Sequence, residues 1–272
     1  MSKALSQHWP EYLMEAVGLG LFMLSACVFA VLLEHPGAVL HQELPDPLLR
    51  RLLMGLAMAL TAVGIIYSPW GQQSGAHINP AVTLSFWYLG KIEHWDAVFY
   101  VMAQFLGAAV GVGLAALMLG SALAEPPVSY IITLPGMAGV ALAFTVELLI
   151  SMGLMGVVLI ASNRTNLAPY TGLFAGGLVA LYITVFAPYS GMSMNPARSL
   201  GSALFAGQWR PLWIYFTAPP LGMLLAAEIY HRIQGPHAVK CCKLHHENDK
   251  RCIFRCNYQR TGRDPVQSVA RG

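Results

Sequence analysis

The feature that most constrains the fold of this chain is a short sequence that occurs twice. Ser-Gly-Ala-His-Ile-Asn-Pro-Ala at 74–81 returns as Ser-Gly-Met-Ser-Met-Asn-Pro-Ala at 190–197. Each copy opens a short apolar stretch, 79–89 and 195–205, about half as long as the roughly 20 residues that a helix needs to cross a bilayer. Such a half-helix is tolerated at membrane depth only where protein or a watery cavity surrounds it. The duplication therefore predicts two re-entrant helices inside a larger bundle.

The composition places most of the chain in a membrane. Charged residues make up 11% of it and hydrophobic residues 56%, whereas about a quarter of a soluble domain is charged. Six apolar segments are long enough to cross, and we expect the first to be retained as a span rather than cleaved as a signal. We place the spans near 11–33, 48–68, 97–120, 136–161, 168–188 and 209–232.

The spans and half-helices divide into two similar halves. The first repeat runs from about 11 to 120 and the second from about 136 to 232, each with three spans and one half-helix. Because three is odd, the second half must insert upside down, so that the half-helices meet near the midplane from opposite sides. The predicted fold is an all-α membrane protein with a transmembrane domain over 1–232 and a tail over 233–272.

The two half-helix starts have a chemistry of their own. Asparagine is a good N-cap, and proline at the first helical position loses no hydrogen bond. Both N-termini would aim about half a positive charge each at one central spot, where the asparagine amides offer N–H donors to water. This pattern predicts a passage for neutral molecules that repels cations and protons. The residues are Asn79-Pro80-Ala81 and Asn195-Pro196-Ala197.

Four further ionisable or polar residues lie near these starts. Arg198 follows the second triplet, and an arginine at membrane depth must face water or a partner. We interpret it as a pore constriction, the alternative being a residue that snorkels to the outer surface. We expect Glu15 and Glu147 to accept hydrogen bonds from the re-entrant loops, with a proton relay as the alternative. His77 is assigned to the same local packing, with gating by titration as its alternative.

Taken together, these residues resemble the aquaporin family of major intrinsic proteins. The paired triplets are joined by Ala-Gln-Phe-Leu-Gly at 103–107 and Pro-Pro-Leu-Gly at 219–222. The resemblance covers about 11–232. It implies six tilted helices, two half-helices and a homotetramer in the cell membrane with one pore per subunit. Because the spans contain no nucleophile–base or metal-catalytic spacing, we expect no enzyme activity.

The resemblance also bears on the substrate. Glycerol-conducting relatives usually carry Asp after the arginine, where this chain has Ser199, and the pair Tyr215-Phe216 also resembles the water-selective branch. The leading hypothesis is therefore a passive water channel. A broader facilitator for glycerol, urea, other small solutes or gases remains open, as does a coupled secondary transporter.

The expected selectivity filter departs from the water-channel pattern. Where typical water channels have a histidine in the fifth span, this chain has Ile183, beside Tyr182. Met192 takes a position that is often Cys or a small residue, and the second span would contribute from among Met54, Ala59 and their neighbours. The filter formed with Arg198 should be unusually apolar.

The tail over 233–272 carries half of the chain's 16 basic residues, which predicts that both termini are cytoplasmic. Its cysteines and histidines have the chemistry to bind zinc or another soft metal. Two other interpretations stay open, a disulfide or redox role and a solvated basic tail near anionic lipid. We expect no other cofactor and no nucleic-acid partner. The candidate ligands are Cys241, Cys242, His245, His246, Cys252 and Cys256.

Overall fold

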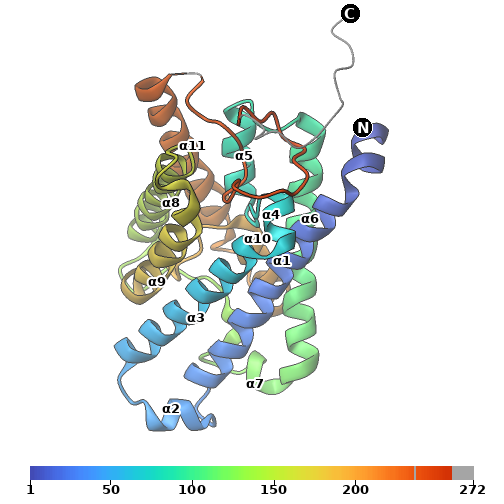
Figure 1. Cartoon of the computed structure of the whole chain (residues 1–272). Coiled ribbons are helices and arrows are strands. Elements are labelled where there is room, and N and C mark those ends of the chain that lie inside the picture. The colour runs from blue at the N-terminus through green and yellow to red at the C-terminus, as the bar shows by residue number, and fades with distance from the viewer. Residues whose placement is uncertain (236, 259–272) are drawn as a thin grey trace, which may run out of the picture.

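The computed structural model describes residues 1–235 and 237–258, and this part of the chain consists of helices and loops without a strand. Six helices are long and apolar enough to cross a membrane, and they form one bundle (Figure 1). They are α1 (Ser2–Glu34), α3 (Pro47–Tyr67), α6 (His94–Leu119), α8 (Val140–Ser162), α9 (Thr171–Ser190) and α11 (Leu212–Gln234).

Two of the predicted spans begin elsewhere than expected. α1 starts at Ser2 rather than near residue 11, because its polar first turns continue the helix beyond the apolar segment. α8 starts at Val140 rather than near residue 136. Gly139 precedes it with a φ of 90°, a left-handed conformation that ends the loop and that glycine adopts without steric strain.

The two half-helices are α5 (Pro80–Tyr88) and α10 (Pro196–Ala206), as the repeat predicts. Short helices connect the longer ones: α2 (Val39–Glu43), α4 (Pro69–Ser74) and α7 (Ser121–Ala124), with 3-10 turns at Ser129–Ile131 and Ala168–Tyr170. α4 lies directly before the loop that leads to the first Asn-Pro-Ala. It begins where the Ser68 hydroxyl accepts a hydrogen bond from the Gly71 N–H at 3.0 Å.

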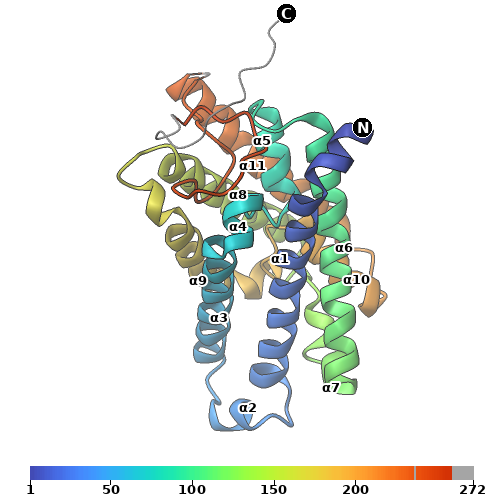
Figure 2. The same ribbon diagram turned by 45° about the vertical axis from the view of Figure 1, so that its right-hand side comes forward.

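The helices pair in a way that relates the two repeats. α1 packs along α6, and α8 packs along α11, so that the first and third helices of each repeat are partners, while α3 packs along α9 (Figure 2). Small residues bring these backbones close together. A Cβ atom at Gly107 would lie 2.0 Å from the Ala16 carbonyl oxygen, and one at Gly222 would lie 2.2 Å from that of Leu148. Close approach through small residues is how membrane helices gain contact.

This packing predicts that Gly107→Ala destabilises the bundle. The added methyl group meets backbone of α1 rather than a movable side chain, and overpacking of this kind typically costs about 1–3 kcal/mol. Gly64→Ala is the matched control, because a Cβ at Gly64 has nothing within 4 Å. We expect a lower melting temperature in detergent for Gly107→Ala and an unchanged one for Gly64→Ala. Equal melting temperatures for the two variants would show that α1 and α6 can move apart enough to accommodate the added methyl group without loss of stability.

The start of α1 and the end of α11 lie at the same end of the bundle, and α2 lies at the other (Figure 1). The described part of the tail, 237–258, has no helix or strand and folds back over the first of these ends (Figure 2). The interpretation of a solvated tail therefore does not hold for residues 241–244, which are buried, whereas the basic side chains of Lys250, Arg251 and Arg255 are exposed. Cys242 and Lys243 are only 0% and 2% exposed. The basic residues Arg260, Arg263 and Arg271 lie outside the described part of the chain.

Candidate pore and its lining

The two asparagines begin the half-helices in the predicted manner. The Asn79 Oδ1 accepts a hydrogen bond from the Ala81 N–H at 2.9 Å. The Asn195 Oδ1 accepts from the N–H groups of Ala197 and Arg198 at 3.0 and 3.2 Å. Each side-chain oxygen is thus directed into its own helix, and each amide nitrogen is left to face outward.

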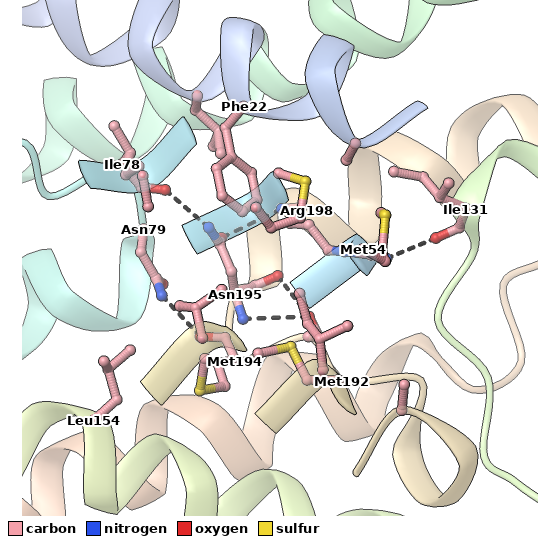
Figure 3. Close-up of a pocket in the computed structure, with 18 of the residues that line it drawn as sticks. Phe22, Met54, Ile78, Asn79, Ile131, Leu154, Met192, Met194, Asn195 and Arg198 are labelled. Atoms are coloured by element: carbon pink, nitrogen blue, oxygen red, sulfur yellow. Dashed lines mark hydrogen bonds between the residues drawn. The ribbon is translucent and has the colours of Figure 1, made fainter. Parts of the chain in front are cut away.

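The amide nitrogen of each asparagine donates a hydrogen bond to the loop of the other repeat. The Asn79 Nδ2 donates to the Met194 carbonyl and the Asn195 Nδ2 donates to the Ile78 carbonyl, both at 2.8 Å (Figure 3). Each NH₂ group has two donors, so one N–H of each remains after this reciprocal pairing. Both side chains line the same cavity. The structure therefore brings together two asparagines that are far apart along the chain.

The loops that lead into the half-helices have an unusual backbone. Ala76 and Ile78 have φ values of 53° and 40°, and their counterparts Met192 and Met194 have 43° and 53°. Residues other than glycine rarely adopt this left-handed conformation, and each such residue costs of order 1–3 kcal/mol. The surroundings must supply compensating bonds at both loops.

Glu15 and Glu147 supply them, as the sequence predicted. The Glu147 carboxylate accepts hydrogen bonds from the Ser190 hydroxyl at 2.7 Å and from the Ser193 and Met194 N–H groups at 2.9 and 2.7 Å. The Glu15 carboxylate accepts the equivalent bonds in the first repeat, from Ser74, His77 and Ile78. Both carboxylates are fully buried.

Three buried side chains that complete this support were not assigned this role from the sequence. The Tyr100 hydroxyl donates to the Ser74 carbonyl at 2.7 Å, and the Tyr215 hydroxyl donates to the Ser190 carbonyl at 2.6 Å. Gln104 Nε2 donates to Glu15 at 2.8 Å. Both tyrosines lie near the start of the third helix of their repeat, which is the signal that could have identified them. Tyr215 is a loop anchor that does not line the cavity.

A cavity of about 380 Å³ runs past the two asparagines. Its wall is a set of helix stripes with residues three or four apart, the spacing of one helix face. Most of this lining is apolar. The stripes are Leu19, Phe22, Ala26 and Ala30 of α1; Met54, Met58, Ala62 and Ile66 of α3; Leu154 and Val158 of α8; and Ala175, Val179, Ile183 and Ala187 of α9.

Arg198 lines this cavity together with Met54 and Met192 (Figure 3). Ile183 lines the same cavity. Its Nη1 donates to the Ile131 carbonyl at 2.8 Å, which fixes the direction of the guanidinium. Ile131 belongs to the loop before α8, whose part in holding the arginine could not be predicted. In the first repeat the residue three positions after the asparagine is Val82, so the fixed charge occurs in one repeat alone.

Two of the expected filter residues do not line the cavity. Tyr182 is rotated toward α8, where its hydroxyl lies close to Gly153, and Ala59 faces Gly176 of α9. Neighbouring positions on a helix differ by about 100° in direction, so Ile183 and Met58 face the cavity where Tyr182 and Ala59 cannot.

Other residues take positions that the sequence did not indicate. Glu34 and Arg51 line the cavity at the end of α1 and the start of α3, one turn beyond the apolar stripes, so the helical spacing could have found them. Ser199 is fully buried away from the cavity. Its hydroxyl lies within hydrogen-bond distance of Thr133 and Ser193, at 2.8 and 2.6 Å.

Four of the six candidate metal ligands in the tail come together. Cys241, His246, Cys252 and Cys256 place their ligand atoms within 4.8 Å of one another, whereas Cys242 and His245 point elsewhere. The ring of His245 packs edge-on against Tyr67. His77 has two partners, the Thr83 hydroxyl and the Cys242 carbonyl, both at 3.1 Å. His77 thus packs locally, as expected, and also contacts the tail, which was not foreseen.

Two opposed half-helices that meet inside a cavity through six spanning helices define a transmembrane channel built from an inverted repeat. Comparison with known families agrees. The profile of the major intrinsic proteins matches residues 2–230, and the chain belongs to this family, whose members are passive channels rather than enzymes.

Individual relatives and a solved structure are consistent with this assignment. The chain is 38% identical over 183 residues to aquaporin NIP6-1 of Arabidopsis thaliana, an alignment that covers 66% of this chain and 57% of the relative. It is 34% identical to aquaporin-4 of Rattus norvegicus, over 70% of this chain and 58% of the relative. The alignments thus span little more than half of these relatives. The fold is similar to that of the aquaglyceroporin from Plasmodium falciparum, with a TM-score of 0.68, 22% identity and coverage of 85% and 99% of the two chains.

Proposed function

We propose that this protein is a passive membrane channel for water and small neutral solutes that excludes ions and protons. The observation that carries this proposal is the reciprocal bonding of Asn79 and Asn195 beside a single cavity. Each asparagine retains one N–H donor for a passing molecule. A water molecule that accepts both bonds must turn, and this interrupts the hydrogen-bonded file along which a proton could migrate.

Electrostatics supports the exclusion of cations. The N-termini of α5 and α10 each present roughly half a positive charge, and the Arg198 guanidinium adds a full one within the same cavity. Water is a poor screen in such a narrow, mostly apolar space. A cation would lose its hydration and meet a positive potential, while a neutral molecule meets neither penalty.

The lining favours a solute range broader than water. Among the expected filter residues that line the cavity with Arg198, Met54, Ile183 and Met192 are apolar. An apolar wall opposite a single hydrogen-bond donor suits molecules that have both a carbon skeleton and a polar group, such as glycerol or urea. The solved neighbour is named an aquaglyceroporin, and several relatives are named aquaporins, so both water and neutral solutes belong to the proposal.

The setting of the channel in the membrane is also part of the proposal. The loops and helix ends on the side of the α1 start carry Lys3, Lys91, Arg164 and Arg232 besides the basic tail, against Arg50, Arg51 and Arg210 on the other side. This bias predicts cytoplasmic termini. We further propose a homotetramer in the plasma membrane, with one pore per subunit, on the strength of the family resemblance.

The direct test is stopped-flow light scattering of proteoliposomes that contain the purified full chain. Water, glycerol and urea should each equilibrate faster than in protein-free vesicles, and a pH-sensitive dye should report no added proton leak. Vesicles that behave like the protein-free control for all three molecules, both with and without a metal chelator, would refute the channel.

Ile183→His tests the origin of the solute range. The imidazole restores a polar contact at the apolar wall, and one hydrogen bond to a passing water is worth about 1 kcal/mol, about fivefold in rate. We expect the ratio of water to glycerol permeability to rise by about this factor. Ile183→Leu, which keeps the wall apolar, should leave the ratio as it is. A ratio that is the same in all three proteins would exclude Ile183 from the filter.

A further inference from the structure

The described tail segment contains a compact group of three thiols and one imidazole. Cys241 Sγ lies 3.6 Å from Cys252 Sγ, and Cys256 Sγ lies 3.0 Å from His246 Nε2. All four ligand atoms fall within 4.8 Å of one another. No regular helix or strand within 237–258 holds them there.

The Cys241–Cys252 separation of 3.6 Å fits a tetrahedral metal ion, and the Cys256–His246 separation of 3.0 Å is somewhat shorter than such an ion requires. Zinc binds sulfur at about 2.3 Å and nitrogen at about 2.0–2.1 Å, so two ligand atoms on a tetrahedron are about 3.5–3.8 Å apart. Three cysteines and one histidine form one of the ligand sets that structural zinc sites use. A disulfide would leave the histidine and the third thiol unused, and disulfides are rare in the cytoplasm, where we place this tail.

The tail segment is attached to both halves of the channel. On the first repeat, the Leu244 N–H donates to the Gly75 carbonyl at 3.2 Å, and the Arg255 N–H donates to the Lys91 carbonyl at 3.0 Å. On the second repeat, the Lys240 N–H donates to Asn163 Oδ1 at 2.6 Å, and the Tyr258 hydroxyl donates to the Ser162 carbonyl at 2.7 Å. The segment therefore bridges the end of the bundle from one repeat to the other.

The attachment reaches the re-entrant loop itself. The Phe254 ring stacks on the His77 ring at 5.6 Å between centroids, and His77 Nε2, at the edge of the same ring, hydrogen-bonds to the Cys242 carbonyl. His77 is two residues before Asn79. The tail thus contacts the loop that positions one of the two pore asparagines.

One tail side chain enters the pore. Leu244 lines the central cavity together with Ala76, His77 and Val158, and it is only 6% exposed. Beside it, the Lys243 ammonium group donates to the carbonyls of Lys250 and Arg251 at 3.1 and 2.7 Å. Lys243 thereby joins the stretch around residue 243 to the stretch around residues 250–251, next to the four-ligand cluster. These bonds hold the neighbouring Leu244 in its position in the cavity wall.

From this arrangement we propose that zinc bound by Cys241, His246, Cys252 and Cys256 folds the tail into a plug whose Leu244 closes the cytoplasmic mouth of the channel. Loss of the metal releases the plug and opens the mouth. A segment this short buries too little surface to hold a fold without a staple, and metal binding can supply the missing folding energy. This regulatory role rests on the proposed channel function.

The metal site is tested on the full chain, purified with an affinity tag that contains no histidine. Elemental analysis should find one zinc ion per chain, and cobalt substitution should give the visible spectrum of tetrahedral thiolate coordination. Cys252→Ser and Cys256→Ser should each lose the metal. Cys242→Ser, which changes an adjacent thiol outside the cluster, should keep it. Protein without zinc, or equal zinc loss in all three variants, would overturn the site.

The plug is tested by water permeability of proteoliposomes in the zinc-loaded and chelator-stripped states. We expect stripping to raise the permeability several-fold and zinc to restore the lower value. Leu244→Ala should still bind zinc but conduct in the loaded state as the stripped protein does. Identical flux in the loaded and stripped states, with zinc retention verified, would overturn the plug.

The outcomes separate this inference from the channel proposal. If the stripped full chain and Leu244→Ala both fail to conduct water or glycerol, the channel function itself is wrong. If they conduct as fast as the zinc-loaded wild type, the channel function holds and the zinc plug is wrong. If stripping opens the channel while loaded Leu244→Ala stays closed, Leu244 is not the closing residue.

Discussion

Glu147→Ala is expected to yield no folded channel, or one with a severely lowered melting temperature. Its carboxylate is the only assigned acceptor of the Ser190 hydroxyl and the Ser193 and Met194 N–H groups within the described structure. A buried donor left without its partner costs about 1–3 kcal/mol. Three such donors together would exhaust much of the roughly 5–15 kcal/mol that keeps a typical protein folded.

Ser151→Ala is the matched control for this variant. Ser151 is fully buried on the same helix, one turn further on, and its hydroxyl has no hydrogen-bond partner among the described residues. Fluorescence-detected size-exclusion chromatography after heating should show wild-type behaviour for Ser151→Ala and loss of the monodisperse peak for Glu147→Ala. Similar melting curves for the two variants would mean that Glu147 does not hold the re-entrant loop. Glu147→Gln, which keeps one acceptor oxygen, should fall between them.

Arg198→Ala is expected to make the channel leak cations and protons. The substitution removes the guanidinium charge that the Ile131 carbonyl holds in place in the cavity lined also by Met54, Ile183 and Met192. A unit charge at about 4 Å contributes about 4 kcal/mol in an effective dielectric of 20. The dipoles of α5 and α10 remain, so we expect a rise in ion leak of about tenfold or more, since about 1.4 kcal/mol corresponds to tenfold.

The measurement is dye-reported proton and sodium flux in metal-stripped proteoliposomes, with water flux recorded in parallel. Arg198→Lys keeps the charge and should remain nearly ion-tight, although its ammonium cannot reproduce the planar guanidinium. Water flux should change much less than ion flux in both variants. If the Arg198→Ala channel is as impermeable to ions as the wild type, the barrier to ions lies at the N-termini of α5 and α10 and not at Arg198.

Both experiments concern residues that the sequence identified, and the reason is that their roles are encoded locally. Asn79 and Asn195 cap helices because asparagine is a favoured N-cap and the proline that follows is favoured at the first helical position. The length of the apolar stretches then fixes which helices cross and which cannot. Glu15 and Glu147 could be assigned to the loops because a carboxylate in an apolar span must find donors.

The lining of the pore was only partly predictable. Of the residues expected in the selectivity filter, Ile183 and Met192 line the cavity and Tyr182 and Ala59 do not, because the direction of a side chain depends on how its helix is rotated against its neighbours. The same rotation brought in Arg51 and Glu34. Tyr215 and Ser199, which the sequence had suggested as markers of the substrate, are instead buried and hydrogen-bonded to residues of the loops.

By itself, then, the sequence determined the inverted repeat, the two half-helix starts and the arginine beside them, since each follows from residues adjacent in the chain. Only the tertiary structure decided which four of six tail ligands converge and that Leu244 lines the cavity. It also decided that His77 contacts the tail. His77 and Cys242 are 165 residues apart in the chain, and the position of the tail depends on how the helices are rotated and packed, which no local sequence pattern records.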